Sequence, residues 1–180
     1  MIKEGKEIEG LINGCKKDDR RCQEQLYRSY YKAMMNLCLR YTQNERDAME
    51  VLNTGFYKVF KNISSYQPLK GSFYTWASTI IIHTCIDFIN AGKRVSNKME
   101  LSAATEIAIP SEVISKMSSL ELLHFLKELS PVTRSVFNLF IVEGYSHKEI
   151  GQLLHIPEGT SKWHLSEARK HLQKMIQLNK

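Results

Sequence analysis

The sequence has little glycine and proline, with nine glycines and four prolines among 180 residues. Because these residues interrupt helices and mark tight turns, their scarcity favours long continuous helices. Apolar residues recur at intervals of three and four along most of the chain, and no segment shows a convincing strand alternation. The sequence therefore predicts an all-α protein.

The chain also lacks the spacings that mark metal and cofactor sites. Its four cysteines form no Cys-x-x-Cys pair and have no histidines nearby at the spacing of zinc ligands. Four histidines fall in the C-terminal part, but no acidic or thiol ligand accompanies them at the right spacing: they are His147, His155, His164 and His171. We expect reduced, packed thiols, no metal and no cofactor.

Long hydrophobic runs are missing as well. The longest strongly apolar run lies around Ile80 to Ile82, which is far too short to span a bilayer. The first ten residues, MIKEGKEIEG, contain acids and no apolar stretch, unlike a secretory signal. We therefore expect a cytoplasmic protein with no direct membrane insertion.

No catalytic constellation is recognisable. Paired carboxylates, a nucleophile beside a base and a phosphate-binding glycine loop are all absent at suitable spacing, so we do not expect an enzyme. The formal net charge of +6 is compatible with an anionic partner. Many soluble proteins without a nucleic-acid role have a similar net charge, so the charge alone does not identify the partner.

The N-terminal half predicts a bundle of four helices. Their apolar faces are Ile8–Ile12, Leu26–Tyr41, Ala48–Ile63 and Phe73–Phe88. Asn44 is a suitable N-cap for the third helix. The segment Tyr66–Ser72 contains proline and glycine and is predicted to be the loop before the fourth helix.

A composition change divides the chain in two. Residues 93–117 are small and polar and have no sustained periodicity, which is typical of a linker. Periodicity returns after Ser118, and Glu121 follows three residues later in a capping-box pattern. We expect two small helical domains, residues 1–92 and residues 118–180, joined by this linker.

The C-terminal half predicts a helix-turn-helix. A second capping box, Ser146-x-x-Glu149, begins a short helix, and a break at His155–Pro157 leads into a longer helix over Glu158–Lys174. His155 stands where glycine is common, and histidine tolerates a left-handed backbone better than bulky residues do. This order places the longer helix in the DNA major groove in DNA-binding proteins, but it also occurs in domains that never contact DNA.

The longer helix carries side chains suited to DNA. Lys162, Trp163, Ser166 and Glu167 are expected on one side, while Arg169, Lys170 and Lys174 would meet phosphates. Packing of Trp163 against a neighbouring helix is the alternative to base contact.

Two sets of residues, in this order along the chain, follow the pattern of one known family. The N-terminal set consists of Leu26-Tyr27, Tyr30-Tyr31, Asp47-Ala48, Phe56, Phe60, Gly71-Ser72-Phe73, Trp76, Ile80 and Cys85-Ile86-Asp87. The C-terminal set consists of Leu129-Ser130-Pro131, Glu143 to Gly151, Gly159 to Lys162 and Ala168-Arg169-Lys170. With these residues the chain resembles the extracytoplasmic-function (ECF) sigma factors of the sigma-70 family. Two ordered matches separated by a linker are far more specific than either alone.

The resemblance implies an RNA polymerase sigma factor that directs promoter-specific transcription initiation. Its partners would be core RNA polymerase, promoter DNA and a membrane-bound anti-sigma factor. In this family the N-terminal domain, sigma region 2, docks on polymerase and recognises and melts the minus-10 element. The C-terminal domain, sigma region 4, reads the minus-35 element.

The resemblance also implies three sets of contact residues. Those for the minus-35 element are Thr160, Lys162, Trp163, Ser166, Glu167, Arg169 and Lys170. Those for the minus-10 element are Lys70, Ser72, Tyr74, Trp76, His83, Lys93 and Arg94. Those for core polymerase are Asp47, Glu50, Asn53 and Phe56, with core packing as the alternative role of Phe56.

Departures from the family pattern modify these expectations. Ile82 and Asn90 stand where arginines are frequent, so contacts with strand-separated DNA would rely on His83, Lys93 and Arg94. Glu167 stands at a position that is commonly basic. Because a carboxylate accepts from cytosine and repels phosphate, Glu167 should change base preference rather than add affinity.

The alternative function is a helix-turn-helix transcriptional regulator whose N-terminal half senses a ligand or forms a dimer. The properties of the N-terminal half distinguish a sigma factor from such a regulator. A sensor needs a ligand pocket or a dimer seam, whereas a polymerase subunit binds core enzyme as a monomer.

Overall fold

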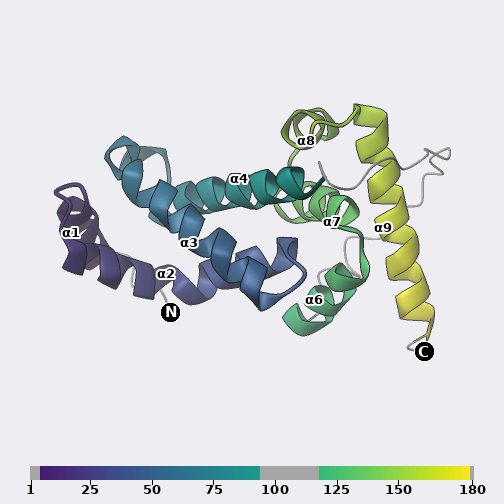
Figure 1. The fold of residues 1–180 in the computed structure, drawn as a ribbon, viewed down its shortest axis with the longest axis horizontal. Coiled ribbons are helices and arrows are strands. Elements are labelled where there is room, and N and C mark those ends of the chain that lie inside the picture. Colours follow the sequence, from purple (N-terminus) through teal and green to yellow (C-terminus); the bar gives the residue numbers. More distant parts are fainter. Residues whose placement is uncertain (1–4, 94–117, 179–180) are drawn as a thin grey trace. The chain divides into compact units, whose positions relative to one another are not determined.

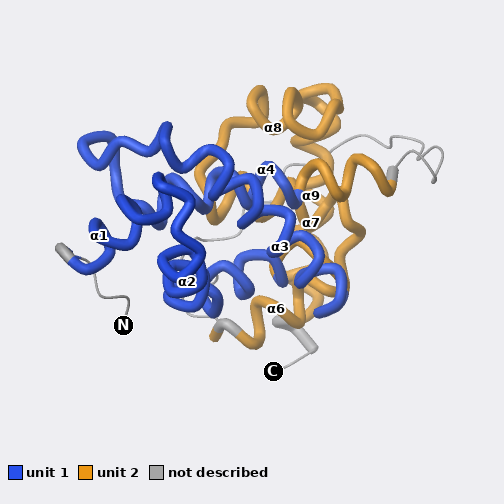
Figure 2. Tube along the Cα trace, turned by 60° about the vertical axis from the view of Figure 1, so that its left-hand side comes forward, with its two compact units in different colours: residues 1–39, 44–85 blue, residues 40–43, 86–180 orange. Residues whose placement is uncertain are grey.

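The computed structural model describes residues 5–93 and 118–178, and every regular element within them is helical (Figure 1). The contacts divide the chain into two compact units (Figure 2). Unit 1 comprises residues 1–39 and 44–85, and unit 2 comprises residues 40–43 and 86–180. The predicted linker lies outside the described residues except for Lys93, the last residue of a helix.

The four predicted N-terminal helices are confirmed. They are α1 (Lys6–Cys15), α2 (Arg20–Tyr41), α3 (Glu45–Lys61) and α4 (Phe73–Lys93). Asn44 caps α3 as expected, because its side-chain oxygen accepts a hydrogen bond from the amide of Asp47 at 2.9 Å. The loop before α4 contains two short 3₁₀ turns, η1 (Ile63–Ser65) and η2 (Pro68–Lys70).

The core of unit 1 is aromatic and aliphatic. Its fully buried side chains include Leu26, Tyr30, Met34, Leu52, Phe56 and Ile81. Gly55 permits a close approach between α3 and α4, since a Cβ there would lie 2.8 Å from Cγ1 of Ile81. The apolar stripes read from the sequence therefore form this core.

Unit 2 contains α6 (Ser119–Glu128), α7 (Pro131–Phe137), a π turn η3 (Asn138–Val142), α8 (His147–Leu154) and α9 (Glu158–Leu178). Both predicted capping boxes are present. The amide of Ser118 donates to Glu121 at 2.7 Å, and the amide of Ser146 donates to Glu149 at 2.8 Å. The π turn was not expected from the sequence.

Arg134 on α7 is fully buried in unit 2. Its Nε donates to the carbonyl oxygen of Leu126 at 2.6 Å, and its Nη2 donates to that of Leu129 at 3.0 Å. These carbonyls lie at the C-terminal end of α6, where the helix leaves carbonyl oxygens without their usual amide partners, so the guanidinium satisfies them. Burial lowers the pKa of Arg134 to about 10, so the guanidinium is still charged at neutral pH.

None of the helices in the described ranges combines the length and apolar character that crossing a membrane requires.

Candidate nucleic-acid and polymerase interfaces

The predicted turn between α8 and α9 is confirmed (Figure 1). His155 ends α8 in the left-handed conformation, with φ 52° and ψ 46°. The amide of Ile156 then donates to the carbonyl oxygen of Gly151 at 3.0 Å. A Cβ on Gly151 would lie 2.8 Å from the Ile156 carbonyl oxygen, so only glycine fits here without a shift of the backbone.

A polar contact joins the first turns of the two helices. Nδ1 of His147 lies 2.9 Å from Oγ of Ser161, which is buried. The histidine ring is also stacked on the ring of Phe140, at a centroid distance of 4.4 Å. Burial, followed by the charge of Lys162, lowers the pKa of His147, so its neutral form is favoured.

The packed side of α9 is continuous. It consists of Ser161, His164, Leu165, Ala168 and Leu172, all buried. His164 adds a polar contact within this core, because its Nδ1 lies 2.9 Å from Oγ1 of Thr133 on α7. One side of α9 is thus fixed, which leaves the other available to a partner.

The residues predicted to contact the minus-35 element differ in exposure. Lys162 is exposed, Ser166 is 6% exposed, and the remaining five, Thr160, Trp163, Glu167, Arg169 and Lys170, are half-buried. Ser166 lies one helical turn from both Lys162 and Lys170, on the same side of α9. Its side chain is short and covered, which corrects the expectation that it projects alongside its longer neighbours.

Two lysines of α9 form ion pairs with glutamates of the same helix. Nζ of Lys162 lies 2.8 Å from Glu158, and Nζ of Lys170 lies 2.6 Å from Glu167. The hydrogen bond and charge of Lys162 lower the pKa of Glu158. A phosphate that binds either lysine would therefore compete with a carboxylate for the ammonium. Glu167 would share its carboxylate between Lys170 and a cytosine amino group.

Trp163 is half-buried, and its ring lies edge-on to that of His164 at a centroid distance of 4.8 Å. Packing therefore occupies part of the indole, while the remainder stays accessible. Both roles considered for this residue are compatible with that position.

The loop between α3 and α4 is closed by hydrogen bonds. The hydroxyl of Tyr66 donates to the carbonyl oxygen of Gly71 at 3.1 Å. Ser72 then caps α4, since its Oγ accepts from the amide of Thr75 at 3.1 Å. Phe73 is buried beneath the loop, within 5.5 Å of the Tyr66 ring. The loop therefore has a defined conformation.

The residues predicted to contact the minus-10 element lie in or after this loop. Lys70, Ser72 and His83 are exposed, whereas Tyr74 and Trp76 are half-buried. The Trp76 ring packs on Tyr66 and Phe73 at centroid distances of 5.5 and 5.7 Å. Arg94 lies outside the described residues, and for Lys93 only the backbone position is described.

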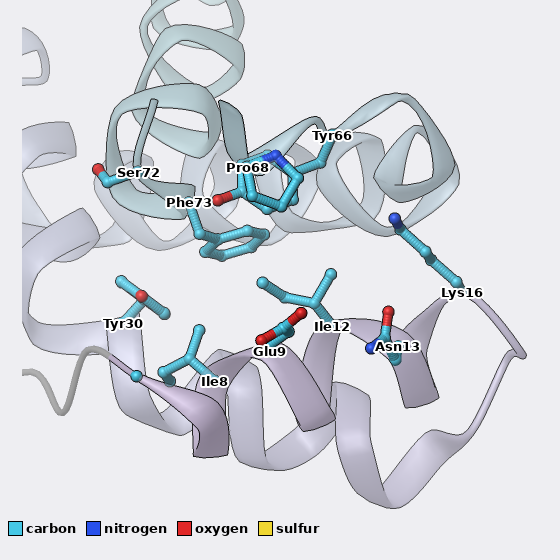
Figure 3. Close-up of a pocket in the computed structure, with 11 residues that line it drawn as sticks. Ile8, Glu9, Ile12, Asn13, Lys16, Tyr30, Tyr66, Pro68, Ser72 and Phe73 are labelled. Atoms are coloured by element: carbon cyan, nitrogen blue, oxygen red, sulfur yellow. The ribbon is translucent and has the colours of Figure 1, made fainter. Parts of the chain in front are cut away.

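A pocket of about 330 Å³ opens between α1 and this loop (Figure 3). Its apolar wall includes Ile8 and Ile12 of α1, Tyr30 of α2 and Phe73 of α4, and Pro68 covers the side nearest the loop. Glu9, Asn13 and Lys16 add polar groups along α1. No sequence pattern predicts this pocket, because its walls come from segments that are distant along the chain.

The residues predicted to contact polymerase lie on α3. Glu50 and Asn53 are exposed, and Oδ1 of Asn53 accepts a hydrogen bond from the hydroxyl of Tyr27 at 3.1 Å. Asp47 is half-buried, and its carboxylate accepts from the side chain of Asn44 at 3.0 Å. Phe56 is 2% exposed, which agrees with core packing, the other role considered for this residue.

No group of three histidine, cysteine, aspartate or glutamate side chains that could hold a metal occurs within residues 5–93 and 118–178. Three cysteines, Cys15, Cys38 and Cys85, are buried, Cys22 is half-buried, and none of the four forms a disulfide.

Comparisons with known proteins match the two halves separately. Residues 26–95 match the model of sigma-70 region 2, and residues 119–172 match the model of sigma-70 region 4. The ECF RNA polymerase sigma-E factor of Haemophilus influenzae is 25% identical over 183 residues, which cover 94% of this chain and 95% of that protein. The ECF RNA polymerase sigma factor SigE of Mycolicibacterium smegmatis is 27% identical over 157 residues, but the match spans only 60% of its length.

A solved structure shows the same fold. The sigma factor RpoE of Bartonella quintana, determined in complex with the anti-sigma factor NepR, superposes with a TM-score of 0.50 at 19% identity. The match covers 87% of this chain and 98% of that one. With both family regions present in order, the chain belongs to the ECF group of the sigma-70 family and is an RNA polymerase sigma factor of transcription initiation.

Proposed function

We propose that this sigma factor divides promoter recognition between its two family regions. Region 4 reads the minus-35 element through α9, and region 2 recognises and melts the minus-10 element through the loop before α4. The domains extend over residues 1–92 and 118–180, with residues 93–117 as the linker. The factor itself catalyses no reaction and acts in the cytoplasm.

The observation that carries this proposal is the geometry of α8 and α9. The left-handed residue His155 and the contact between His147 and Ser161 fix the angle between the helices. One side of α9 is buried, while Lys162 is exposed near its N-terminus, the end that approaches base edges in helix-turn-helix proteins. Lysine in this place donates to the acceptors on guanine.

In region 2, Lys70 would contact a phosphate, and Ser72, two residues later, is also exposed. Tyr74 and Trp76 are half-buried, so part of each side chain is accessible to an unstacked base. Base–aromatic stacking contributes about 1–3 kcal/mol per base. His83, together with Lys93 and Arg94, would follow the separated strand.

Glu50 and Asn53 support a polymerase contact on α3, since both are exposed one turn apart on the same side. Glu50 supplies a charge and Asn53 an amide for polar contacts at the rim of an interface. Control by an anti-sigma factor is part of the proposal. It is supported by the Bartonella quintana relative, whose structure contains such a partner.

The test is transcription by core polymerase reconstituted with the full chain on a library of promoter sequences. We expect initiation at a subset of promoters that share two sequence boxes, and a complex with one copy of the chain per core enzyme. No promoter-specific initiation on any library member would contradict the proposal.

The same preparation tests the alternative of a ligand-sensing or dimeric regulator. That alternative predicts a dimer in solution without core enzyme, or operator binding that depends on a small molecule in the pocket beside α1. A monomer that binds promoter DNA tightly only as part of the polymerase complex contradicts it.

A further inference from the structure

A chain of polar contacts connects the start of α7 with α9. Oγ of Ser130, the N-cap of α7, lies 2.9 Å from Oγ1 of Thr133. Oγ1 of Thr133 in turn lies 2.9 Å from Nδ1 of His164 on α9. Thr133 is 6% exposed and His164 is 5% exposed, so water has little access to either side chain. Because an unmade hydrogen bond is costly in such a place, this contact fixes the imidazole ring.

The fixed imidazole lies against the preceding side chain of α9. The ring of Trp163 is edge-on to that of His164, with an angle of 72° between the ring planes. Aromatic rings attract each other in this arrangement, since the positive edge of one meets the negative face of the other. The imidazole therefore forms a wall beside the indole and restricts its rotation.

Trp163 points away from the packed side of α9. An α-helix has 3.6 residues per turn, so Trp163 is turned by about 200° from both Ser161 and Leu165, which are buried. His164 lies at the border of the packed side, where it contacts α7. The accessible part of the half-buried indole therefore lies on the side of α9 that the packing leaves open.

Apart from its N–H the indole is apolar, and the apolar group that bases present in the major groove is the 5-methyl group of thymine. We propose that Thr133 acts through His164 to hold Trp163 against a thymine methyl group of the minus-35 element. Trp163 makes the contact with the base, while Thr133 and His164 are positioning residues that do not touch the DNA. This inference rests on the proposed reading of the minus-35 element by α9, and it assigns one chemical group of that element to one side chain.

The test measures the binding of duplex promoters by holoenzyme reconstituted from core polymerase and the full chain. The reference duplex carries the minus-35 sequence that the wild-type protein selects. In a series of otherwise identical duplexes, each thymine of that element, on either strand, is replaced in turn by uracil, which lacks only the 5-methyl group. The ratio of the two affinities at each position isolates the methyl contact, because the hydrogen-bonding groups of the base pair are unchanged.

Three variants separate positioning from stability. Thr133→Val removes the hydroxyl group and keeps a branched side chain of similar size, whereas Thr133→Ser keeps the hydroxyl group that contacts His164. Ser135→Ala is the matched control, because Ser135 is also fully buried on α7 but donates to the carbonyl oxygen of Pro131 in the same helix. Trp163→Ala removes the proposed methyl contact itself and gives the reference for its complete loss. Thermal unfolding reports the stability that each variant has lost.

At one position we expect wild-type holoenzyme to bind the thymine duplex about fourfold more tightly than the uracil duplex, which is the effect of burying one methyl-sized group. Thr133→Val and Trp163→Ala should lower this ratio to near one. Thr133→Ser and Ser135→Ala should retain the ratio, even where their Tm falls.

Three results would overturn the inference and leave the proposed function intact. In the first, wild-type holoenzyme distinguishes the selected element from a scrambled one but binds uracil as well as thymine at every position. In the second, Thr133→Val and Ser135→Ala weaken binding alike and both retain the ratio. In the third, Thr133→Ser loses the ratio as Thr133→Val does. If wild-type holoenzyme does not distinguish the selected element from the scrambled one, the proposed function fails and this inference fails with it.

Discussion

Nδ1 of His147 lies 2.9 Å from Oγ of Ser161, which joins the first turn of α8 to the first turn of α9. The contact lies between the supporting helix and the helix proposed to read DNA. Because Ser161 immediately precedes Lys162, the position of the histidine ring helps to set the direction of that lysine. The protonation state of one residue is therefore coupled to the geometry of the proposed DNA interface.

The first prediction concerns pH. The folded-state pKa of His147 is lowered, so below the unfolded-state value of about 6.5 the unfolded chain binds the proton more readily than the folded one. Stability from this group is fully present above that pH and falls as the pH drops toward the lowered pKa. Thermal unfolding measured between about pH 5 and 7.5 should show a decrease in Tm on acidification that is smaller in His147→Gln. Equal slopes of Tm against pH in the wild type and in His147→Gln would contradict a lowered pKa of His147.

The second prediction uses the two capping boxes as matched sites. Ser146→Ala and Ser118→Ala each remove a side chain that accepts from a helix amide, at 3.3 and 3.2 Å respectively. Each should lower the free energy of unfolding by about 1 kcal/mol in denaturant titrations. Only Ser146→Ala loosens the start of α8, so it alone should weaken binding to minus-35 DNA. Similar losses of binding in both variants would point to stability as the common cause.

The third prediction concerns the left-handed turn residue. Glycine adopts φ 52° without the steric cost that His155 bears, so His155→Gly should raise the free energy of unfolding by about 1 kcal/mol. His155→Val should lower it by more, because a β-branched side chain is strained there. Asp18→Gly at φ 59° is the control in unit 1 and should also be stabilising. If His155→Gly instead lowered the free energy of unfolding, contacts of the imidazole would stabilise the fold by more than the backbone strain destabilises it.

The fourth prediction separates phosphate contacts from base contacts. Lys174 is exposed and lies two turns beyond Ser166. Lys174→Ala should weaken binding to all DNA sequences alike, and the slope of log affinity against log salt concentration should become shallower by about one. Lys162→Ala should weaken the cognate minus-35 sequence more than a scrambled one. Glu158→Gln frees Lys162 from its 2.8 Å ion pair and should increase affinity for both. Fluorescence anisotropy at several salt concentrations measures the DNA affinity of all three variants. An equal loss of affinity for the cognate and scrambled sequences in Lys162→Ala would contradict a base contact by this lysine.

Local sequence signals predicted most of the helical architecture. The capping residues Asn44, Ser118 and Ser146 all accept from the amides that the patterns indicated, and His155 is left-handed as its position at the turn implied. Such signals depend on neighbours within four residues, which is why one sequence is enough to read them.

Features that depend on distant residues were not predictable in this way. Arginine is rarely buried, yet Arg134 is fully buried and donates to the carbonyl oxygens of Leu126 and Leu129 at the end of α6. The exposure of Leu69 similarly follows from a turn whose closing bonds no pattern specifies.

The most direct test of the divided recognition is to map initiation on a promoter library in which the two boxes are randomised separately. Lys162→Ala should relax the sequence requirement only in the upstream box. Lys70→Ala, combined with Tyr74→Ala, should weaken initiation through the downstream box alone. If either variant changes the sequence requirement equally in both boxes, regions 2 and 4 do not read the promoter independently. The proposed division of promoter recognition would then be wrong.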